Sequence, residues 1–384
     1  MRLILPLLAF AVAAVSLLTV VRAPDHIWTW KLVIIAGEFG HWFVLLSLGL
    51  AIAAGFGPAG AGRIVTLVLC AGATVGFLRP VFVAGRLAQT LPAGLHAAFG
   101  GGAASLALDY GRLYRGAAAP AASITTEVFA RPAGQELKLD FYRPGFAKDP
   151  LEKPRPCVVV IHGGGWDGGD RKQLDGWNAR FVARGYAVAA ISYRLAPKWI
   201  WPAQRDDVMA AITWLKANAA KLGIDPARLV LLGRSAGGQL ATAVGYGAND
   251  PAIRGVIALY APHDMPFAWS VSRTDDALNS INLFKQYFGG PPDTPERQAH
   301  YEQGSGQLLA HQGSPPTLLI HGVPDTLAWV RHSERLAGRL QELGVPHYFL
   351  ELPWATHGFD FNPDGPSGQL ADYAIAQFLA AVTH

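Results

Sequence analysis

Six short apolar runs follow residue 150 of this 384-residue chain, and helical patterns separate them. The runs are Cys157–Ile161, Tyr186–Ile191, Leu229–Leu232, Gly255–Tyr260, Thr317–Ile320 and Tyr348–Leu352. Runs this short and this apolar are typical of strands buried on both faces of a sheet. The clearest helical patterns are Pro202–Leu222, Leu327–Leu343 and Gly368–Ala381. The alternation predicts an α/β fold in which helices cover both faces of a mostly parallel central sheet.

Two more strands are expected ahead of these runs. Ile124–Ala130 and Glu136–Tyr142 have strand-like patterns, and the turn-rich stretch Arg131–Gly134 lies between them. This arrangement predicts a β-hairpin at the start of the domain. We therefore expect a single α/β domain at residues 123–384.

The first 78 residues are almost free of charge, unlike the rest of the chain. Their charged residues are Arg2, Arg22, Asp25, Lys31, Glu38 and Arg63. Three apolar stretches in this region, 3–21, 32–56 and 64–83, are long enough to cross a hydrocarbon core of about 30 Å as helices. We therefore expect a transmembrane region at residues 1–90 with about three transmembrane helices, followed by a linker at 91–122.

The first stretch has two features of a secretory signal peptide, an N-terminal arginine and an apolar stretch that follows it. It is longer than a usual signal core, and no small-x-small cleavage site follows before Pro24, so a retained anchor is favoured. The basic flanks divide into two groups, Arg22, Lys31, Arg79 and Arg86 against Arg2, Arg63 and the N-terminal amine. Under the positive-inside rule this division leans slightly toward a cytoplasmic domain. The expected location is an integral, multi-pass membrane protein in contact with the lipid bilayer.

Two polar residues interrupt the second apolar stretch. Glu38 and His41 are three residues apart and share one helix face. An intramembrane site is one interpretation. The simpler interpretation places the two residues near the membrane interface or pairs them inside the helix bundle, and we favour it.

Charge and cysteine content exclude several other classes. The net charge is +4 and the isoelectric point is about 9.0. However, Lys and Arg do not cluster with aromatic residues, so nucleic-acid binding is not expected. The two cysteines, Cys70 and Cys157, form neither a C-x-x-C pair nor a zinc pattern, and no metal site is expected.

The strongest local signal is the hexapeptide Gly233–Gly238, with sequence GRSAGG. It follows the apolar run Leu229–Leu232 and precedes a helix-compatible stretch. A G-x-S-x-G motif between a strand and a helix forms a sharp turn that presents the serine above the sheet. Ser235 is therefore the candidate nucleophile.

A second glycine-rich segment, His162–Trp166, follows the first buried run. Glycines there let backbone N–H groups approach a substrate closely and stabilise a transient oxyanion. Gly164 and Gly165, together with the N–H of Ala236 beside the serine, are the candidate oxyanion-hole donors.

A serine nucleophile needs a histidine base and a carboxylate that orients the base. His357 lies in a loop after the last predicted strand and is the best candidate base. Asp325 follows the preceding strand and is the candidate acid, which agrees with the chain order serine, acid, histidine. Asp264 and Asp360 are its rivals. His162 and His321 also follow strands, but we expect both to brace their loops.

These motifs together resemble the α/β-hydrolase superfamily over about residues 124–382. The resemblance rests on the two glycine-rich motifs, the loops of Asp325 and His357, and the stretches Tyr193–Pro197 and Pro202–Leu215. Within the superfamily, the chain resembles the HGGG-type esterases and lipases, of the hormone-sensitive-lipase-like and isoprenylcysteine-methylesterase-like kinds. The resemblance implies an eight-stranded sheet, acyl-ester substrates, no cofactor, and Ser235, Asp325 and His357 as the triad. Arg234 departs from the family pattern. A cation there either favours a negatively charged substrate or pairs with a nearby carboxylate, and we favour the pairing.

A lid-like insertion is expected at about residues 264–314. Its aromatic residues Trp269, Phe284, Tyr287, Phe288 and Tyr301 either line an acyl pocket or fill the core beneath the insertion, and the sequence leaves both possibilities open.

The sequence therefore predicts a membrane-anchored serine esterase or lipase that acts on small-molecule or lipid esters. The alternatives are an amidase or peptidase on the same scaffold, and a catalytically silent binding domain. All proposed catalytic residues lie beyond residue 160. A chain that begins near residue 121 is therefore expected to be soluble and to cleave short esters.

Overall fold

A computed structural model describes residues 4–101, 105–118, 120–144 and 153–384. Eight strands form one sheet in the order β1-β2-β4-β3-β5-β6-β7-β8. The β1–β2 and β2–β4 pairs are antiparallel and the other pairs are parallel. The strands are β1 (Ala122–Ala130), β2 (Leu137–Pro144), β3 (Arg155–Ile161), β4 (Ala187–Ile191), β5 (Ile224–Arg234), β6 (Ile253–Leu259), β7 (Thr317–Gly322) and β8 (His347–Leu352). The mostly parallel α/β sheet predicted from the apolar runs is confirmed.

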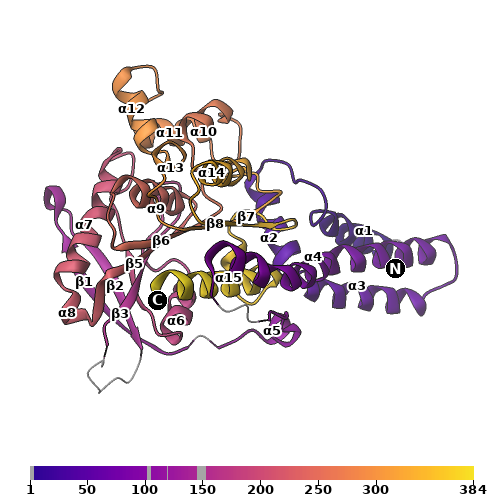
Figure 1. The fold of residues 1–384 in the computed structure, drawn as a ribbon. Coiled ribbons are helices and arrows are strands. Elements are labelled where there is room, and N and C mark those ends of the chain that lie inside the picture. Colours follow the sequence, from indigo (N-terminus) through magenta and orange to yellow (C-terminus); the bar gives the residue numbers. More distant parts are fainter. Residues whose placement is uncertain (1–3, 102–104, 119, 145–152) are drawn as a thin grey trace.

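Helices cover both faces of this sheet (Figure 1). One face carries α7 (Ala203–Ala217), α9 (Ala236–Gly247) and α14 (Arg331–Glu342), and the other carries α6 (Asp175–Ala183) and α15 (Pro366–Thr383). Side chains alternate along each buried strand, so β3 sends Val159 to the first face and Val158 and Val160 to the second. The domain therefore has two apolar cores, one on each side of the sheet.

The shorter elements lie mainly in connections. The short helix α8 (Ala219–Leu222) precedes β5, and the single turns η1 (Pro132–Gly134) and η2 (Phe359–Phe361) lie in loops. The region expected to be a lid-like insertion contains α10 (Met265–Val271), α11 (Ser280–Phe288), α12 (Pro295–Gln303) and α13 (Gly306–Leu309).

The N-terminal region forms a helical arm that projects from the α/β domain (Figure 1). Its helices are α1 (Ile4–Leu17), α2 (Ile27–Glu38), α3 (Gly40–Gly55) and α4 (Ala61–Phe99), followed by α5 (Tyr110–Arg115). Helices α1, α3 and the first part of α4 pack side by side in the arm. Helix α2 instead lies against the α/β domain. Helix α4 runs past the arm to Phe99, into the range expected to be a linker.

The expectation of three transmembrane helices is wrong. Within the described residues, α4 is the one helix that is long and apolar enough to cross a membrane, and α2 with α3 would count as a second only as one broken span. Helix α1 has 14 residues and reaches about 21 Å, short of a core of about 30 Å. Helices α2 and α3 meet at an angle of 82°. The apolar stretch at 32–56 is bent because its first part is buried against protein instead of continuing as a straight helix.

The last part of α4 belongs to the core of the α/β domain. Ala84, Ala88, Leu91 and Leu95 are at most 3% exposed and pack with α15 and the sheet. Residues before 121 thus complete one of the two cores. A chain that begins near residue 121 would expose this apolar face and should aggregate, contrary to the solubility expected from the sequence.

The contribution of α4 can be measured with Leu91→Ala. Leu91 is 1% exposed, and truncating a buried leucine costs about 2–5 kcal/mol of unfolding free energy. The matched control is Leu67→Ala on the same helix, because Leu67 is 37% exposed on the arm and should change stability by less than about 0.5 kcal/mol. Thermal unfolding of the detergent-solubilised proteins makes the comparison. Equal melting temperatures for the two variants would contradict this account of α4.

Candidate active site

Ser235 occupies a strained turn between β5 and α9. Its φ angle is +51°, in the left-handed region that residues other than glycine rarely adopt. A Cβ atom on Gly233 would lie 2.0 Å from the Gly237 carbonyl oxygen, and one on Gly237 would lie 2.2 Å from the Ile161 oxygen. Both flanking residues must therefore be glycine for the turn to close. The turn presents the serine side chain at the carboxyl end of the sheet.

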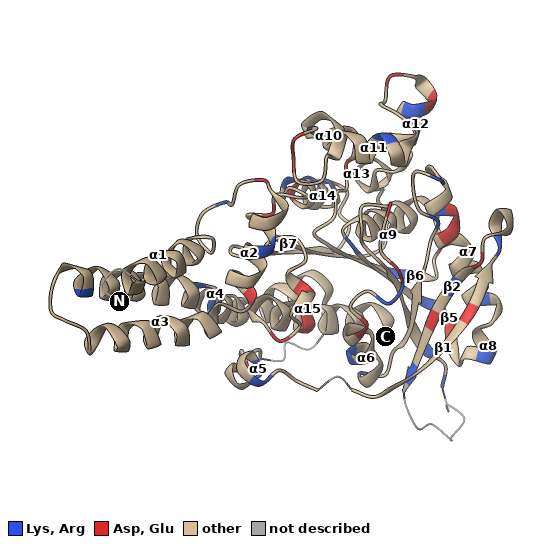
Figure 2. Cartoon of the chain, turned by 180° about the vertical axis from the view of Figure 1, so that it is seen from behind, with Lys and Arg blue, Asp and Glu red and all other residues tan. Residues whose placement is uncertain are grey.

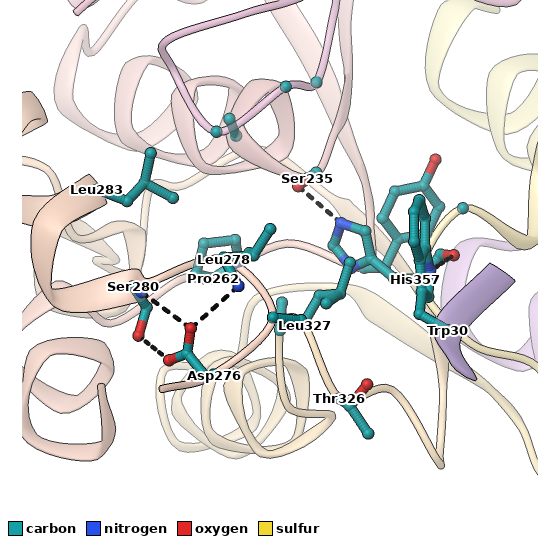
Figure 3. Close-up of a pocket in the computed structure, with 18 of the residues that line it drawn as sticks. Trp30, Ser235, Pro262, Asp276, Leu278, Ser280, Leu283, Thr326, Leu327 and His357 are labelled. Carbon is teal, nitrogen blue, oxygen red and sulfur yellow. Dashed lines mark hydrogen bonds between the residues drawn. The ribbon is translucent and has the colours of Figure 1, made fainter. Parts of the chain in front are cut away.

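The structure brings Ser235, His357 and Asp325 together in one hydrogen-bonded chain. The Ser235 Oγ lies 2.8 Å from His357 Nε2, and His357 Nδ1 lies 2.8 Å from an Asp325 carboxylate oxygen. Figure 3 shows the His357 ring pointing toward Ser235. An Nδ1–H that donates to Asp325 leaves Nε2 free to accept the serine proton.

Asp325 is held in an environment that favours its charged form. Its Oδ1 accepts hydrogen bonds from the backbone N–H groups of Leu327 and Ala328, and His321 Nε2 lies 3.3 Å from its Oδ2. Burial opposes ionisation, but the charge of His357 and hydrogen bonds from His321 and His357 outweigh burial and lower the pKa of Asp325. The carboxyl group therefore stays ionised beside the base.

The glycine-rich loop after β3 presents backbone N–H groups to the pocket. No described residue accepts a hydrogen bond from the N–H of Gly164, Gly165 or Ala236, and all three residues line the pocket beside Ser235. The neighbouring Gly163 N–H, in contrast, donates to Gln173 Oε1 at 2.7 Å. These N–H groups remain available to a negatively charged oxygen.

The loop geometry requires glycine at residue 164. Its φ angle is +121°, and a Cβ there would lie 2.4 Å from the Gly168 oxygen. Gly164→Ala should therefore displace the loop and lower kcat for ester hydrolysis by about 10²- to 10³-fold. The matched control is Gly176→Ala in α6, where a Cβ would meet no atom within 4 Å. Steady-state kinetics of both variants provide the test, and equal rates would argue against a role for this loop.

The rival carboxylates have other partners. Asp360 is completely buried, accepts a hydrogen bond from the Tyr260 hydroxyl at 2.5 Å and pairs with Arg234 at 2.5 Å. Asp264 caps α10 and pairs with Arg335 at 2.6 Å. Arg234, the departure from the family pattern, thus pairs with a carboxylate as expected.

Histidines near the site also have structural contacts. His162 stacks on Tyr193 with ring centroids 4.2 Å apart and is hydrogen-bonded to the Gly163 oxygen.

The ring of Tyr260 packs on the ring of His357, with ring centroids 4.6 Å apart. Tyr260 was not singled out in the sequence, because its position opposite the base depends on the pairing of β6 with its neighbours.

A cavity of about 670 Å³ opens beside Ser235. Phe284 and Leu283 of α11 line it, while Tyr287, Phe288 and Tyr301 are buried in the core beneath the insertion. The aromatic residues of the insertion thus divide between the two roles that the sequence left open. Within the described residues no group of His, Cys, Asp and Glu could hold a metal ion.

Helix α2 supplies pocket residues that the sequence did not indicate. Ile27, Trp30 and Ile34 line the cavity with Ser235 and His357. Trp30 stands just ahead of the apolar stretch that was expected to span the membrane at 32–56. Nothing in an apolar helix distinguishes a face that contacts lipid from one that contacts a substrate pocket.

An eight-stranded, mostly parallel sheet with a serine in the turn between its central strand and a helix defines the α/β-hydrolase class. Within this class, residues 139–340, more than half of the chain, match the BD-FAE family. The chain belongs to this family, and the predicted resemblance to α/β hydrolases is confirmed.

Curated relatives and solved structures agree with this assignment. The esterase LipC of Mycobacterium tuberculosis is 31% identical over 64% of this chain and 62% of its own length. The ethyl acetate hydrolase of Pseudomonas putida is 29% identical over 65% of this chain and 79% of its own. Among solved structures, a bacterial heroin esterase covers 71% of this chain and 89% of its own with a TM-score of 0.60 and 25% identity. An esterase of Pyrobaculum calidifontis covers 68% and 86% with a TM-score of 0.57 and 27% identity.

The matched region spans 62%, 63% and 54% of the M. tuberculosis relatives LipC, LipQ and LipM. The similarity thus concerns part of each of these proteins.

Proposed function

We propose that this protein is a serine esterase that hydrolyses carboxylic acyl esters. The observation that carries the proposal is the hydrogen-bonded chain from Ser235 through His357 to Asp325 at the edge of an apolar cavity. The names of the relatives, LipC and ethyl acetate hydrolase among them, support an ester as the substrate.

The reaction proceeds in two steps. The Ser235 oxygen attacks the ester carbonyl while its proton passes to His357 Nε2, and the carbonyl oxygen becomes an oxyanion held by the N–H groups of Gly164, Gly165 and Ala236. Asp325 orients the imidazole and stabilises its charged form. The tetrahedral intermediate then collapses, and His357 gives the proton to the departing alcohol.

Water completes the cycle. His357 takes a proton from a water molecule, whose oxygen attacks the acyl-enzyme. Collapse of this second intermediate releases the carboxylic acid and returns the proton to Ser235. The reaction needs no cofactor, because the chain's own groups supply the nucleophile, the base and the oxyanion donors.

The proposal is tested by covalent labelling and by substrate choice. A fluorophosphonate should label the wild-type protein at Ser235 and should leave Ser235→Ala unlabelled. A matched ester and amide of the same acid should then be cleaved with a strong preference for the ester. Absence of labelling would favour a silent binding domain, and preference for the amide would favour an amidase or peptidase.

We also propose that the arm attaches the enzyme to a lipid bilayer. Its outward-facing residues are apolar and 63–71% exposed at Leu7, Phe10, Ile52, Ile64, Val68 and Val75. Only 33% of the most apolar 18-residue stretch of α4 is buried, whereas a core helix would be mostly covered. Figure 2 shows that charged residues are sparse on the arm and frequent on the α/β domain. Monomeric soluble proteins rarely expose so much contiguous apolar surface.

Four basic residues lie in or next to the part of the arm nearest the α/β domain, namely Arg22, Lys31, Arg79 and Arg86. Arg63 lies near the tip of the arm. This distribution supports an α/β domain on the cytoplasmic side.

Attachment is tested by extracting membranes with carbonate, which should leave the full-length protein in the pellet. Release into the supernatant would refute attachment through the arm.

A further inference from the structure

The N-terminal segment 22–38 contacts three parts of the active site that are far apart in sequence. The Arg22 guanidinium donates to the main-chain oxygen of Asp325 at 3.4 Å. The Asp25 carboxylate accepts a hydrogen bond at 3.2 Å from the N–H of Ala277, in the insertion. The Trp30 indole N–H donates to the main-chain oxygen of His357 at 2.8 Å. An anchor that only held the enzyme at a membrane would need none of these contacts.

Helix α2 packs directly on the loop of His357. A Cβ atom on Gly358 would lie 3.7 Å from Ile34 and 3.8 Å from Trp30, at ordinary van der Waals distance. Figure 3 shows the Trp30 side chain next to His357, on the side of the pocket where α2 enters the view.

The C-terminal end of α2 is fastened to the same part of the chain. The Glu38 carboxylate accepts hydrogen bonds from the Ser367 hydroxyl at 2.5 Å and from the Ser367 N–H at 3.2 Å. The Glu38 main-chain oxygen accepts one from Asn362 at 3.0 Å. These buried contacts hold α2 in a defined position beside residues 357–367. Glu38 is thus buried against the α/β domain, a partner that the sequence did not indicate.

The chemistry decides which part of an ester α2 would contact. The departing alcohol must receive its proton from His357 Nε2, so the alcohol part lies on the histidine side of Ser235. Trp30 and Ile34 line the pocket on that side. Leu283 lies across the pocket from His357 and Trp30 (Figure 3), and Phe284 follows it on α11. The acyl part lies on this second side, next to the glycine-rich loop.

We propose that helix α2 is the alcohol-selecting wall of the active site, with Trp30 and Ile34 in contact with the alcohol part of the ester. Trp30 is also a positioning residue, because its indole N–H holds the main chain at His357. The inference rests on the proposed esterase function. It gives the apolar N-terminal region a part in substrate choice beyond attachment.

The substrate that fits this wall has an apolar alcohol part. Ile27, Trp30 and Ile34 offer hydrocarbon surface, and the indole N–H of Trp30 is already used by His357. Each additional methylene in such a pocket changes kcat/KM by about 10- to 200-fold at most. Alcohols with alkyl or aromatic groups should therefore be preferred to small polar alcohols.

The test uses two ester series with purified full-length protein in detergent. In the first series the acid is butyric acid and the alcohol is graded from methanol to octanol. In the second series the alcohol is ethanol and the acid is graded over the same lengths. Values of kcat/KM from titration of the released acid give the alcohol preference and the acyl preference separately.

Ile34→Ala and Trp30→Ala should each reduce the preference for long over short alcohols by about tenfold while leaving the acyl preference within about twofold of the wild type. Leu283→Ala should instead change the acyl preference by about tenfold and leave the alcohol preference within about twofold of the wild type. Trp28→Ala is the matched control on the same helix, because Trp28 is 65% exposed and does not line the pocket. It should change neither preference.

Trp30→Phe separates positioning from selection. This change keeps an aromatic ring but removes the donor to His357, so kcat should fall about tenfold for all esters alike while KM and the alcohol preference stay nearly unchanged. A purely structural role would lower the melting temperature without this split between kcat and KM.

Several results would overturn the inference. An unchanged alcohol preference in both Ile34→Ala and Trp30→Ala would show that α2 does not contact the alcohol. A change in the acyl preference of these two variants instead would show that α2 contacts the acyl part of the ester and that the alcohol part lies on the side of Leu283. A wild-type protein that hydrolyses neither series would refute the esterase function itself, which keeps the two failures distinct.

Discussion

Ser235→Ala is expected to abolish nearly all ester hydrolysis, with kcat reduced by about 10⁴- to 10⁶-fold while the protein stays folded. Removing the oxygen eliminates the acyl-enzyme route, and only binding and the oxyanion donors remain. The fold should survive because the substituted side chain takes part in one hydrogen bond, to His357 at 2.8 Å. Alanine also keeps the Cβ that the turn already accommodates.

The measurement compares kcat of purified wild type and Ser235→Ala, with melting temperatures to show that both are folded. Ser270→Ala is a suitable control. Among the described residues, the Ser270 hydroxyl bonds to one main-chain oxygen in α10, away from the catalytic relay. A folded Ser235→Ala protein with wild-type turnover would reject the assignment of the nucleophile.

Asp325→Asn should lower kcat by about 10⁴-fold, because an amide neither stabilises the imidazolium nor holds the required tautomer of His357. The effect on stability has a defined sign. The pKa of Asp325 is lowered in the folded protein, so its charge stabilises the fold above its unfolded pKa of about 3.9. That contribution is lost as the pH falls through the folded pKa. The stability difference between wild type and variant should therefore narrow below about pH 4.

The rival carboxylates provide controls of two kinds. Asp264→Asn should retain near-normal kcat, because asparagine also caps helices and the ion pair with Arg335 is partly exposed. Asp360→Asn should mainly reduce stability, by about 3–5 kcal/mol, since it leaves Arg234 buried without its charged partner. A larger loss of kcat in a folded Asp264→Asn protein than in Asp325→Asn would identify a different acid.

The N-terminal helices do more than connect the α/β domain to a membrane anchor, because two of them are part of that domain's core and pocket. Helix α4 completes one of the two cores, and α2 lines the pocket. An ester that partitions into a bilayer would meet the proposed alcohol-selecting wall on the helix that joins α1 to α3. Attachment and substrate choice would then depend on the same N-terminal region.

Much of the α/β domain could be predicted from local sequence patterns. The buried strands appear as short apolar runs because both faces of a parallel sheet are covered. The turn at Ser235 was predictable because close backbone contacts allow only glycine at residues 233 and 237. Such patterns depend on a few neighbouring residues, so they can be recognised without knowledge of the rest of the fold.

Other features depended on contacts between distant residues. Arg234 and Asp360 are 126 residues apart, so only the folded chain identifies the partner of the arginine. The sequence favoured Asp325 over Asp264 and Asp360 by chain order, and the structure brings the Asp325 carboxylate to His357. Pairing of β7 with β8 places their following loops side by side.

The sequence by itself determined an α/β hydrolase with a serine turn, a glycine-rich loop and an apolar N-terminal region. Only the tertiary structure decided that this region is not three straight spans and that α2 and α4 belong to the pocket and the core. The physical reason is that apolar side chains leave water equally well for lipid or for protein, so hydropathy reports that they are buried without reporting their partner. Here α2 is covered by the loop of His357 and the last part of α4 by the sheet, so the partner of both is protein.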